Sequence, residues 1–172
     1  SNASGGEFRK IQNFIGPSNR IEDAVYIPIA ANEIDEYMEN LNFYMNGVPN
    51  SSFRKFNKTD GFVFDEECEP IIKAAGMHVQ FESIHPFLDG NGRLGRILIA
   101  LIAIKEDLVD VPVFFVSEEL EKERTRYYAM LNGVRGYSPD WYSWIKFFIT
   151  ACGRMADSLL SKLKAVEELA SN

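Results

Sequence analysis

The chain has 172 residues, of which 46% are hydrophobic, 13% aromatic and 25% charged. This length and balance are typical of one globular domain with its own hydrophobic core, and they exclude an intrinsically disordered chain. The formal net charge of -7 offers no general attraction to nucleic acid or to anionic membranes. Any phosphate-binding site must therefore be locally basic.

The ends of the chain and its cysteines bear on processing and compartment. We expect residues 1–3 to be the scar of an expression tag and residues 4–172 to form a single domain, an N-terminally truncated one if natural sequence precedes it. No signal peptide is visible, and the longest apolar run, residues 97–104, is too short to span a bilayer. Cys68 and Cys152 match no metal-ligand spacing, which favours isolated half-buried thiols over one disulfide. A cytoplasmic protein is expected.

The first predicted element is a short hairpin within residues 7–29. A turn cluster at residues 16–19 precedes a β-favouring run at residues 24–27, which Pro28 ends. Asn32 then predicts the cap of a helix over roughly residues 33–45, with apolar side chains on one face. A polar loop over residues 47–60 follows.

The later part of the chain is predicted to be helical. Pro70 suits the first turn of a helix that stops before Pro86, because the residue that precedes a proline disfavours the α region. The apolar face of this helix also carries His78, expected to be a core histidine, and Glu82. Further helices are predicted over residues 93–105, from Ser117, and after residues 138–140. In the last helix we expect the aromatic side chains to be core rather than a nucleic-acid platform: Trp141, Trp144, Phe147 and Phe148.

Residues 85–96 carry most of the chemical information. They read His-Pro-Phe-Leu-Asp-Gly-Asn-Gly-Arg-Leu-Gly-Arg and precede a long apolar run. Near its ordinary pKa of about 6.5, an imidazole accepts a proton at neutral pH, so His85 is a candidate general base. Mg²⁺ commonly takes one or two carboxylates and completes its shell with water and phosphate oxygens, which makes Asp89 a candidate ligand.

The second half of the same segment is suited to anions. A Gly-Asn-Gly turn, residues 90–92, allows positive φ values, and at a helix N-terminus its N–H groups face an anion. Arg93 and Arg96 are three residues apart on one helix face and can grip phosphate oxygens from the same side. Each feature alone is more often a helix end, a turn or a solvated arginine. Clustered in an acidic chain, they predict a phosphate-binding site.

The segment resembles the full signature of the Fic domain, HPFx(D/E)GNGRxxR, at every specified position. The resemblance extends to residues 7–16, which look like the family's strand before its flap, and to residues 24–28, which look like the flap's second strand. Val116-Ser117, Tyr127-Tyr128 and residues 141–144 fall where the family's later helices lie. It implies an all-α Fic fold, a helical bundle with a short N-terminal β-hairpin, the flap. It also implies a protein adenylyltransferase, which moves AMP from ATP to a Ser, Thr or Tyr hydroxyl of a target protein.

The resemblance also implies a role for each residue of the signature. His85 would deprotonate the target hydroxyl, Phe87 would anchor the loop in the core, and Asp89 would bind Mg²⁺ at the α- and β-phosphates. Gly90, Asn91 and Gly92 would form the anion hole, with Asn91 near the α-phosphate, while Arg93 and Arg96 would hold the distal phosphates. The flap, about residues 15–28, would align an extended target segment by strand-like pairing.

One feature of many Fic proteins is missing, an inhibitory helix of pattern (S/T)xxxE(G/N) whose glutamate pairs with the second signature arginine, here Arg96. Ser158 and Ser161 are followed four residues later by Lys162 and Ala165, and Ser117 has Glu121 but then Lys122. Such a helix either lies upstream, comes from a separate protein, or does not exist. Other readings of the site are a Fic enzyme of different phosphate transfer, a deAMPylating one, and a non-catalytic nucleotide-binding or interaction domain.

Overall fold

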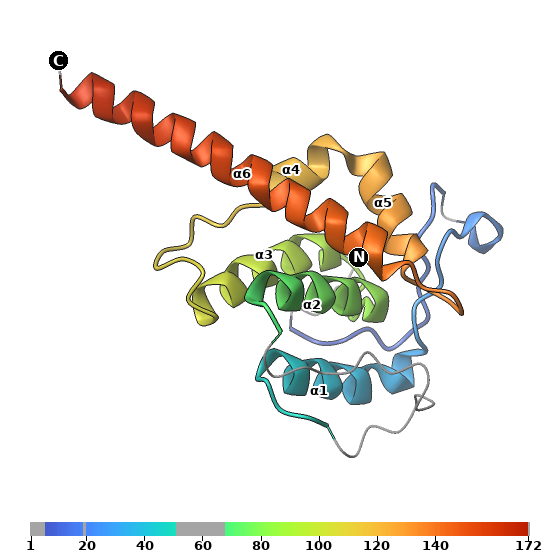
Figure 1. The fold of residues 1–172 in the computed structure, drawn as a ribbon. Helices are drawn as coiled ribbons and strands as arrows, with labels where there is room; N and C mark the ends of the chain where they lie inside the picture. Colours follow the sequence, from blue (N-terminus) through green and yellow to red (C-terminus); the bar gives the residue numbers. More distant parts are fainter. Residues whose placement is uncertain (1–5, 19, 51–67, 172) are drawn as a thin grey trace. The chain divides into compact units, whose positions relative to one another are not determined.

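A computed structural model describes residues 6–18, 20–50 and 68–171. Within these ranges the chain is mostly helical and forms no β-strand, which confirms the predicted all-α class. The helices follow one another along the chain as 3-10 helices Ile21–Asp23 and Ala31–Glu33, then α1 (Ile34–Met45), α2 (Pro70–Ile84), α3 (Asn91–Lys105), α4 (Ser117–Lys122), α5 (Arg124–Gly133) and α6 (Trp141–Ala170) (Figure 1).

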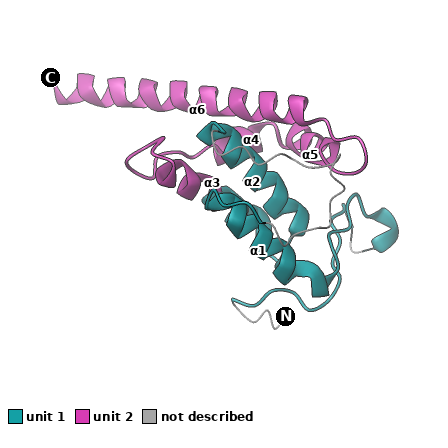
Figure 2. Ribbon diagram, turned by 60° about the horizontal axis from the view of Figure 1, so that its bottom comes forward, with its two compact units in different colours: residues 1–98 teal, residues 99–172 magenta. Residues whose placement is uncertain are grey.

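The chain divides into two compact units, residues 1–98 and 99–172, which Figure 2 distinguishes by colour. Helix α3 begins in the first unit and ends in the second. All the signature residues, 85–96, belong to the first unit. The expectation of a single domain over residues 4–172 stays a prediction.

The first unit is built on the packing of α1 against α2. Helix α2 is buried over most of its length, as expected for a helix with apolar residues on several sides. Gly76 allows a close approach, because a Cβ there would lie 2.6 Å from the Tyr44 hydroxyl. That hydroxyl donates to the Lys73 carbonyl at 3.2 Å, so the two helices are joined by a polar contact as well.

The second unit contains α6 packed on α4 and α5. The Trp144 ring lies 5.6 Å from Phe148 and 6.3 Å from Tyr127, centroid to centroid, and the Trp144 and Phe148 side chains are fully buried. Phe147 is buried too and Trp141 is half-buried, so this aromatic cluster is core as predicted. In the described part of the chain, no helix has both the length and the apolar character needed to cross a membrane.

Several predicted boundaries are confirmed. Pro70 occupies the first turn of α2, His85 follows its last residue, and α4 starts at Ser117. Asp140 caps α6 by accepting a hydrogen bond from the Ser143 N–H at 3.0 Å. Neither cysteine is in a disulfide: Cys68 is half-buried and Cys152 is buried, and burial raises the pKa of Cys152 to about 12.

Other predicted boundaries were wrong. Asn32 does not cap α1, because it lies inside a 3-10 helix and the N-cap position falls to Glu33. Helix α3 starts at Asn91, two residues earlier than expected.

The predicted polar loop, residues 47–60, lies largely outside the described residues, since 51–67 are not among them.

The predicted hairpin is reduced to a single antiparallel bridge between Ile15 and Tyr26. The Ile15 N–H donates to the Tyr26 carbonyl at 2.8 Å, and the Val25 N–H donates to the Ile15 carbonyl at 2.8 Å. Pro17 and Pro28 have no N–H to donate, and residues 21–23 coil into a 3-10 helix. The ladder therefore cannot extend in either direction.

Candidate active site

His85 marks the abrupt end of α2. Its backbone is left-handed, with φ 50° and ψ 60°, a conformation that is uncommon for residues other than glycine. Two contacts hold it there: the His85 N–H donates to the Phe81 carbonyl at 2.9 Å, and the His85 carbonyl accepts from Arg9 Nε at 2.9 Å. With 18% of its side chain exposed, the imidazole remains accessible to solvent.

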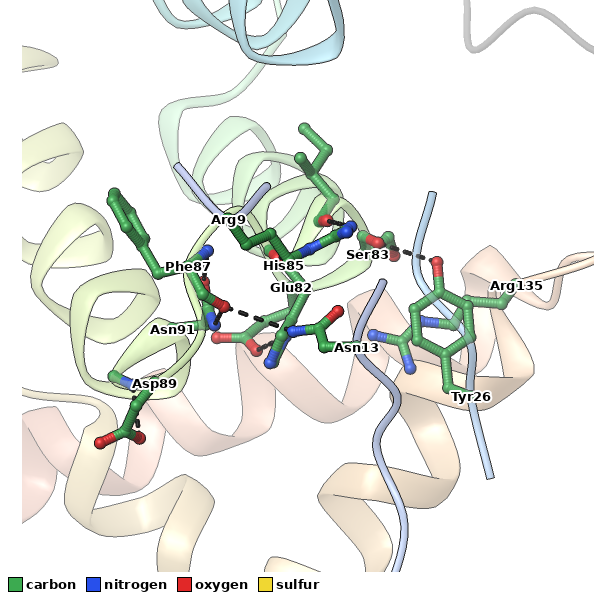
Figure 3. Close-up of polar contacts among 12 residues, drawn as sticks. Arg9, Asn13, Tyr26, Glu82, Ser83, His85, Phe87, Asp89, Asn91 and Arg135 are labelled. Carbon is green, nitrogen blue, oxygen red and sulfur yellow. Dashed lines mark hydrogen bonds and ion pairs between the residues drawn. The ribbon is translucent and has the colours of Figure 1, made fainter. Parts of the chain in front are cut away.

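Asn91 braces the loop that follows. Its side-chain oxygen accepts from the Phe87 N–H at 2.9 Å, and its side-chain nitrogen donates to the Phe87 carbonyl at 2.7 Å (Figure 3). The residue is only 2% exposed. The Asn91 amide therefore closes residues 87–91 into a fixed loop, and the Phe87 ring adds an edge-on contact with Phe8 at 5.5 Å.

The loop ends where α3 begins, and this junction presents backbone donors. Gly90 has φ +84°, and its carbonyl accepts the first bond of the helix, from the Leu94 N–H at 3.0 Å. The N–H groups of residues 91–93 come before that first helical donor, at the positive end of the helix dipole. Helix starts of this kind bind phosphate and other anions.

Both signature arginines turn back over this junction. A Cβ on Gly90 would lie 3.5 Å from Arg93 Nη2, and a Cβ on Gly92 would lie 3.3 Å from Arg96 Nη1. Side chains on a helix lean toward its N-terminus, so arginines in the first two turns of α3 reach the loop. Guanidinium groups and backbone donors thus meet at one place, and the phosphate site expected there stays a prediction.

Asp89 lies at the solvent side of the loop, with 88% of its side chain exposed. One carboxylate oxygen accepts from the Gly90 N–H at 2.6 Å, and the other lies 3.5 Å from Arg93 Nη2. Among the described residues, no group of three or more His, Cys, Asp or Glu side chains could hold a metal. The donor set here is one accessible carboxylate, which fits a Mg²⁺ bound mainly by water and phosphate oxygens.

The N-terminal segment is tied to the end of α2 by contacts that the sequence did not reveal. Besides its bond to His85, Arg9 donates to the carbonyls of Ile11, Ile29 and Ile84, and its own N–H donates to the Pro86 carbonyl at 2.8 Å. It is 3% exposed, and burial lowers its pKa. The only sequence signal was an arginine within an apolar extended stretch.

Two further residues attach the flap region to the same helix end. Asn13 Nδ2 donates to the Phe87 carbonyl at 3.3 Å, and the Tyr26 hydroxyl donates to the Ser83 carbonyl at 2.9 Å (Figure 3). Val25 and Ile27, on either side of Tyr26, are 61% and 53% exposed. The flap region is therefore attached through Asn13 and Tyr26, while Val25 and Ile27 remain exposed.

Glu82 was noticed in the sequence only as a member of the apolar face of α2. In the structure it is 6% exposed, and its Oε2 lies 4.0 Å from Nδ1 of His85. Its sequence signal, a carboxylate on an apolar face one turn before a candidate base, was too weak to single it out.

Comparison with known proteins identifies the family and the fold. The family model described as the Fic/DOC family matches residues 1–103, more than half of the chain. A solved Fic family protein from Desulfovibrio desulfuricans G20 superposes with a TM-score of 0.68 at 20% identity, covering 91% of this chain and 41% of that one. The helical fold is shared with a Fic protein, and because the family model covers more than half of the chain, the chain belongs to the Fic/DOC family.

Curated relatives are named as adenylyltransferases. A probable protein adenylyltransferase of Aquifex aeolicus is 43% identical over 47 residues, which are 27% of this chain and 15% of that protein. The protein adenylyltransferase Fic of Drosophila virilis is 25% identical over 128 residues, 74% of this chain and 20% of that protein. The chain thus spans a fifth or less of the length of these relatives.

Proposed function

We propose that the protein is an adenylyltransferase that moves AMP from ATP to a Ser, Thr or Tyr hydroxyl of a target protein. The observation that carries the proposal is the junction of loop and α3, where backbone donors meet Arg93 and Arg96 from the first two turns of α3, next to the loop braced by Asn91. His85 lies at the other end of that loop. That the transferred group is AMP is inferred from the names of the relatives, which are protein adenylyltransferases.

The reaction needs positioning and charge neutralisation more than covalent help from the protein. Nε2 of His85 would take the proton of the target hydroxyl while the hydroxyl oxygen bonds to the α-phosphorus of ATP. The bond from that phosphorus to the bridging oxygen breaks, and pyrophosphate leaves. A positioned general base typically contributes 10²–10⁴-fold to such a rate.

Different anion-binding groups would contact different phosphates of ATP. In this proposal the turn at residues 90–92 contacts the α-phosphate through the N–H groups of residues 91 and 92, since the Gly90 N–H already donates to Asp89, and Arg93 and Arg96 hold the distal phosphates. Their guanidinium groups already lie over Gly90 and Gly92, so little side-chain movement is required. Asp89 would hold Mg²⁺, which when bound neutralises phosphate charge.

The target protein would dock along the flap. The backbone of residues 24–28 is held by one bridge on the side of Ile15, and its neighbours Val25 and Ile27 expose apolar side chains. An extended peptide that adds backbone hydrogen bonds to such an edge gains affinity, and apolar contacts add specificity. This arrangement would present a hydroxyl toward His85.

The proposal is tested by incubating the chain with α-labelled ATP, Mg²⁺ and a lysate, beside the His85→Ala variant. We expect label on at least one protein, the chain itself included, and none with His85→Ala. Label that does not depend on His85, or no label with a chain that binds ATP in calorimetry, would favour a nucleotide-binding domain without turnover.

A further inference from the structure

Glu82 is a buried carboxylate that the proposed reaction does not use. It lies on α2 one turn before His85, with 6% of its surface exposed. A carboxylate is costly to bury unless charged or hydrogen-bonding groups compensate it. The burial of Glu82 therefore indicates that charged or hydrogen-bonding groups lie next to its carboxylate.

The nearest titratable neighbour is the candidate base. Glu82 Oε2 and His85 Nδ1 are 4.0 Å apart, with 8% and 18% of the two side chains exposed. This is an ion-pair separation and longer than a hydrogen bond, but catalytic hydrogen bonds are often long before substrate binds and tighten afterwards. Figure 3 places both residues at the end of α2, beside the loop.

Helix α3 leaves room for the carboxylate. A Cβ on Gly95 would lie 2.5 Å from Glu82 Oε1 and 3.2 Å from Nδ1 of His78, and a Cβ on Gly92 would lie 3.9 Å from Oε1. Charged or titratable groups near the pair include His78 on α2 and Arg9, which donates to the His85 carbonyl. Arg96 on α3 is also near, because Arg96 Nη1 and Glu82 Oε1 both lie close to the Cβ position of Gly92. Glu82 Oε2 is the carboxylate oxygen that faces Nδ1 of His85.

We propose that Glu82 is a positioning residue for His85: its carboxylate accepts the Nδ1–H of the imidazole and so leaves Nε2 as the proton acceptor. The catalytic meaning rests on the proposed function. When Nε2 takes the hydroxyl proton, the imidazolium carries its positive charge beside the Glu82 carboxylate, which stays ionised. The proton then leaves from Nε2 to solvent. Fixing the imidazole tautomer in this way is how a carboxylate supports histidine bases in general.

The tautomer can be read without any activity. The chain has only two histidines, so nitrogen-15 labelling gives two imidazole spin systems, and His85→Ala identifies which belongs to His85. At a pH well above the titration midpoint, we expect His85 to carry its proton on Nδ1. A proton on Nε2 in the wild-type protein would overturn the proposal, whether or not any variant folds.

Glu82→Gln gives the second readout, with Glu69→Gln at the exposed start of the same helix as control. Loss of the nearby negative charge should lower the titration midpoint of His85 by about one pH unit, and Glu69→Gln should leave it unchanged. An unchanged midpoint in a folded Glu82→Gln protein would contradict the proposal.

Kinetics separate this inference from the proposed function. For AMP transfer, Glu82→Gln should lower kcat about 10-fold or more and move the acid limb of the pH profile downward, with KM for ATP unchanged, and Glu82→Asp should restore part of kcat. A change confined to KM for ATP would mean that Glu82 serves Arg96 instead. If wild-type protein transfers no AMP, the proposed function fails while the tautomer result still decides the role of Glu82.

Discussion

At the scale of single residues, the site depends on a backbone conformation that His85 does not favour by itself. A left-handed non-glycine residue costs on the order of 1–3 kcal/mol and persists only where its surroundings impose it. Arg9 imposes it by bonding the His85 carbonyl together with those of Ile84, Ile29 and Ile11. His85 is thereby held at the start of the loop.

Arg9→Lys should therefore destabilise the protein. An ammonium cannot reproduce the planar fork that reaches four carbonyls, so we expect a loss of about 2–3 kcal/mol in the free energy of unfolding, measured by chemical denaturation. Lys10→Ala, at an exposed neighbouring position, should leave it nearly unchanged. Equal effects of the two substitutions would contradict the role given to Arg9.

Asn91 offers a second test at this scale. Asn91→Ala removes both bonds to Phe87 and should cost about 1–3 kcal/mol of unfolding free energy. Asn91→Asp keeps the acceptor for the Phe87 N–H but faces the Phe87 carbonyl with an oxygen, so it should not restore stability. Thermal or chemical denaturation of the three proteins measures this. Full stability of either variant would show that the brace is dispensable.

At the scale of helices, α2 and α3 approach closely around Gly95. Gly95→Ala would place a Cβ against Glu82 and His78, so we expect a loss of about 1–3 kcal/mol of unfolding free energy from overpacking. Gly153→Ala in α6 is the matched control, because nothing lies within 4 Å of its Cβ position and alanine favours a helix by about 0.5–1 kcal/mol. Denaturation of both variants should give opposite signs, and a stabilising Gly95→Ala would contradict this packing.

The sequence predicted the helices better than their ends. Helical spacing, Pro70 and Pro86 sufficed for α2, and Asp140 for α6, because these signals act locally. The hairpin is shorter than predicted. Residues 24–27 favour β-structure, but Pro17 has no N–H to pair with them and residues 21–23 form a 3-10 helix instead of a strand. The start of α3 was missed by two residues, because Asn91 reads as a turn residue until its bonds to Phe87 are known.

The signature residues could be predicted from one stretch of sequence because they are consecutive. Arg9 and Glu82 could not, since their roles depend on partners brought near by folding: carbonyls up to 76 residues away for Arg9, and the glycine face of α3 for Glu82. The sequence alone gave no means of ranking these two residues above other charged residues.

At the scale of the whole molecule, the two cysteines should react very differently. Burial raises the pKa of Cys152 to about 12, so at pH 8 almost none of it is thiolate in the folded protein, whereas Cys68 is half-buried. With a chromogenic thiol reagent at pH 8 we expect one thiol per chain to react in the native state and the second only after denaturant is added. Two equally fast native reactions would contradict the burial of Cys152 in the second unit.

We propose that the loop between α2 and α3 directs a target hydroxyl to the α-phosphorus of ATP. The most direct measurement compares incorporation into protein from α-labelled and γ-labelled ATP, by the wild-type chain and by His85→Ala. We predict label from α-labelled ATP only, abolished by His85→Ala. Label from γ-labelled ATP would mean that the site transfers a phosphoryl group instead, and would contradict the account.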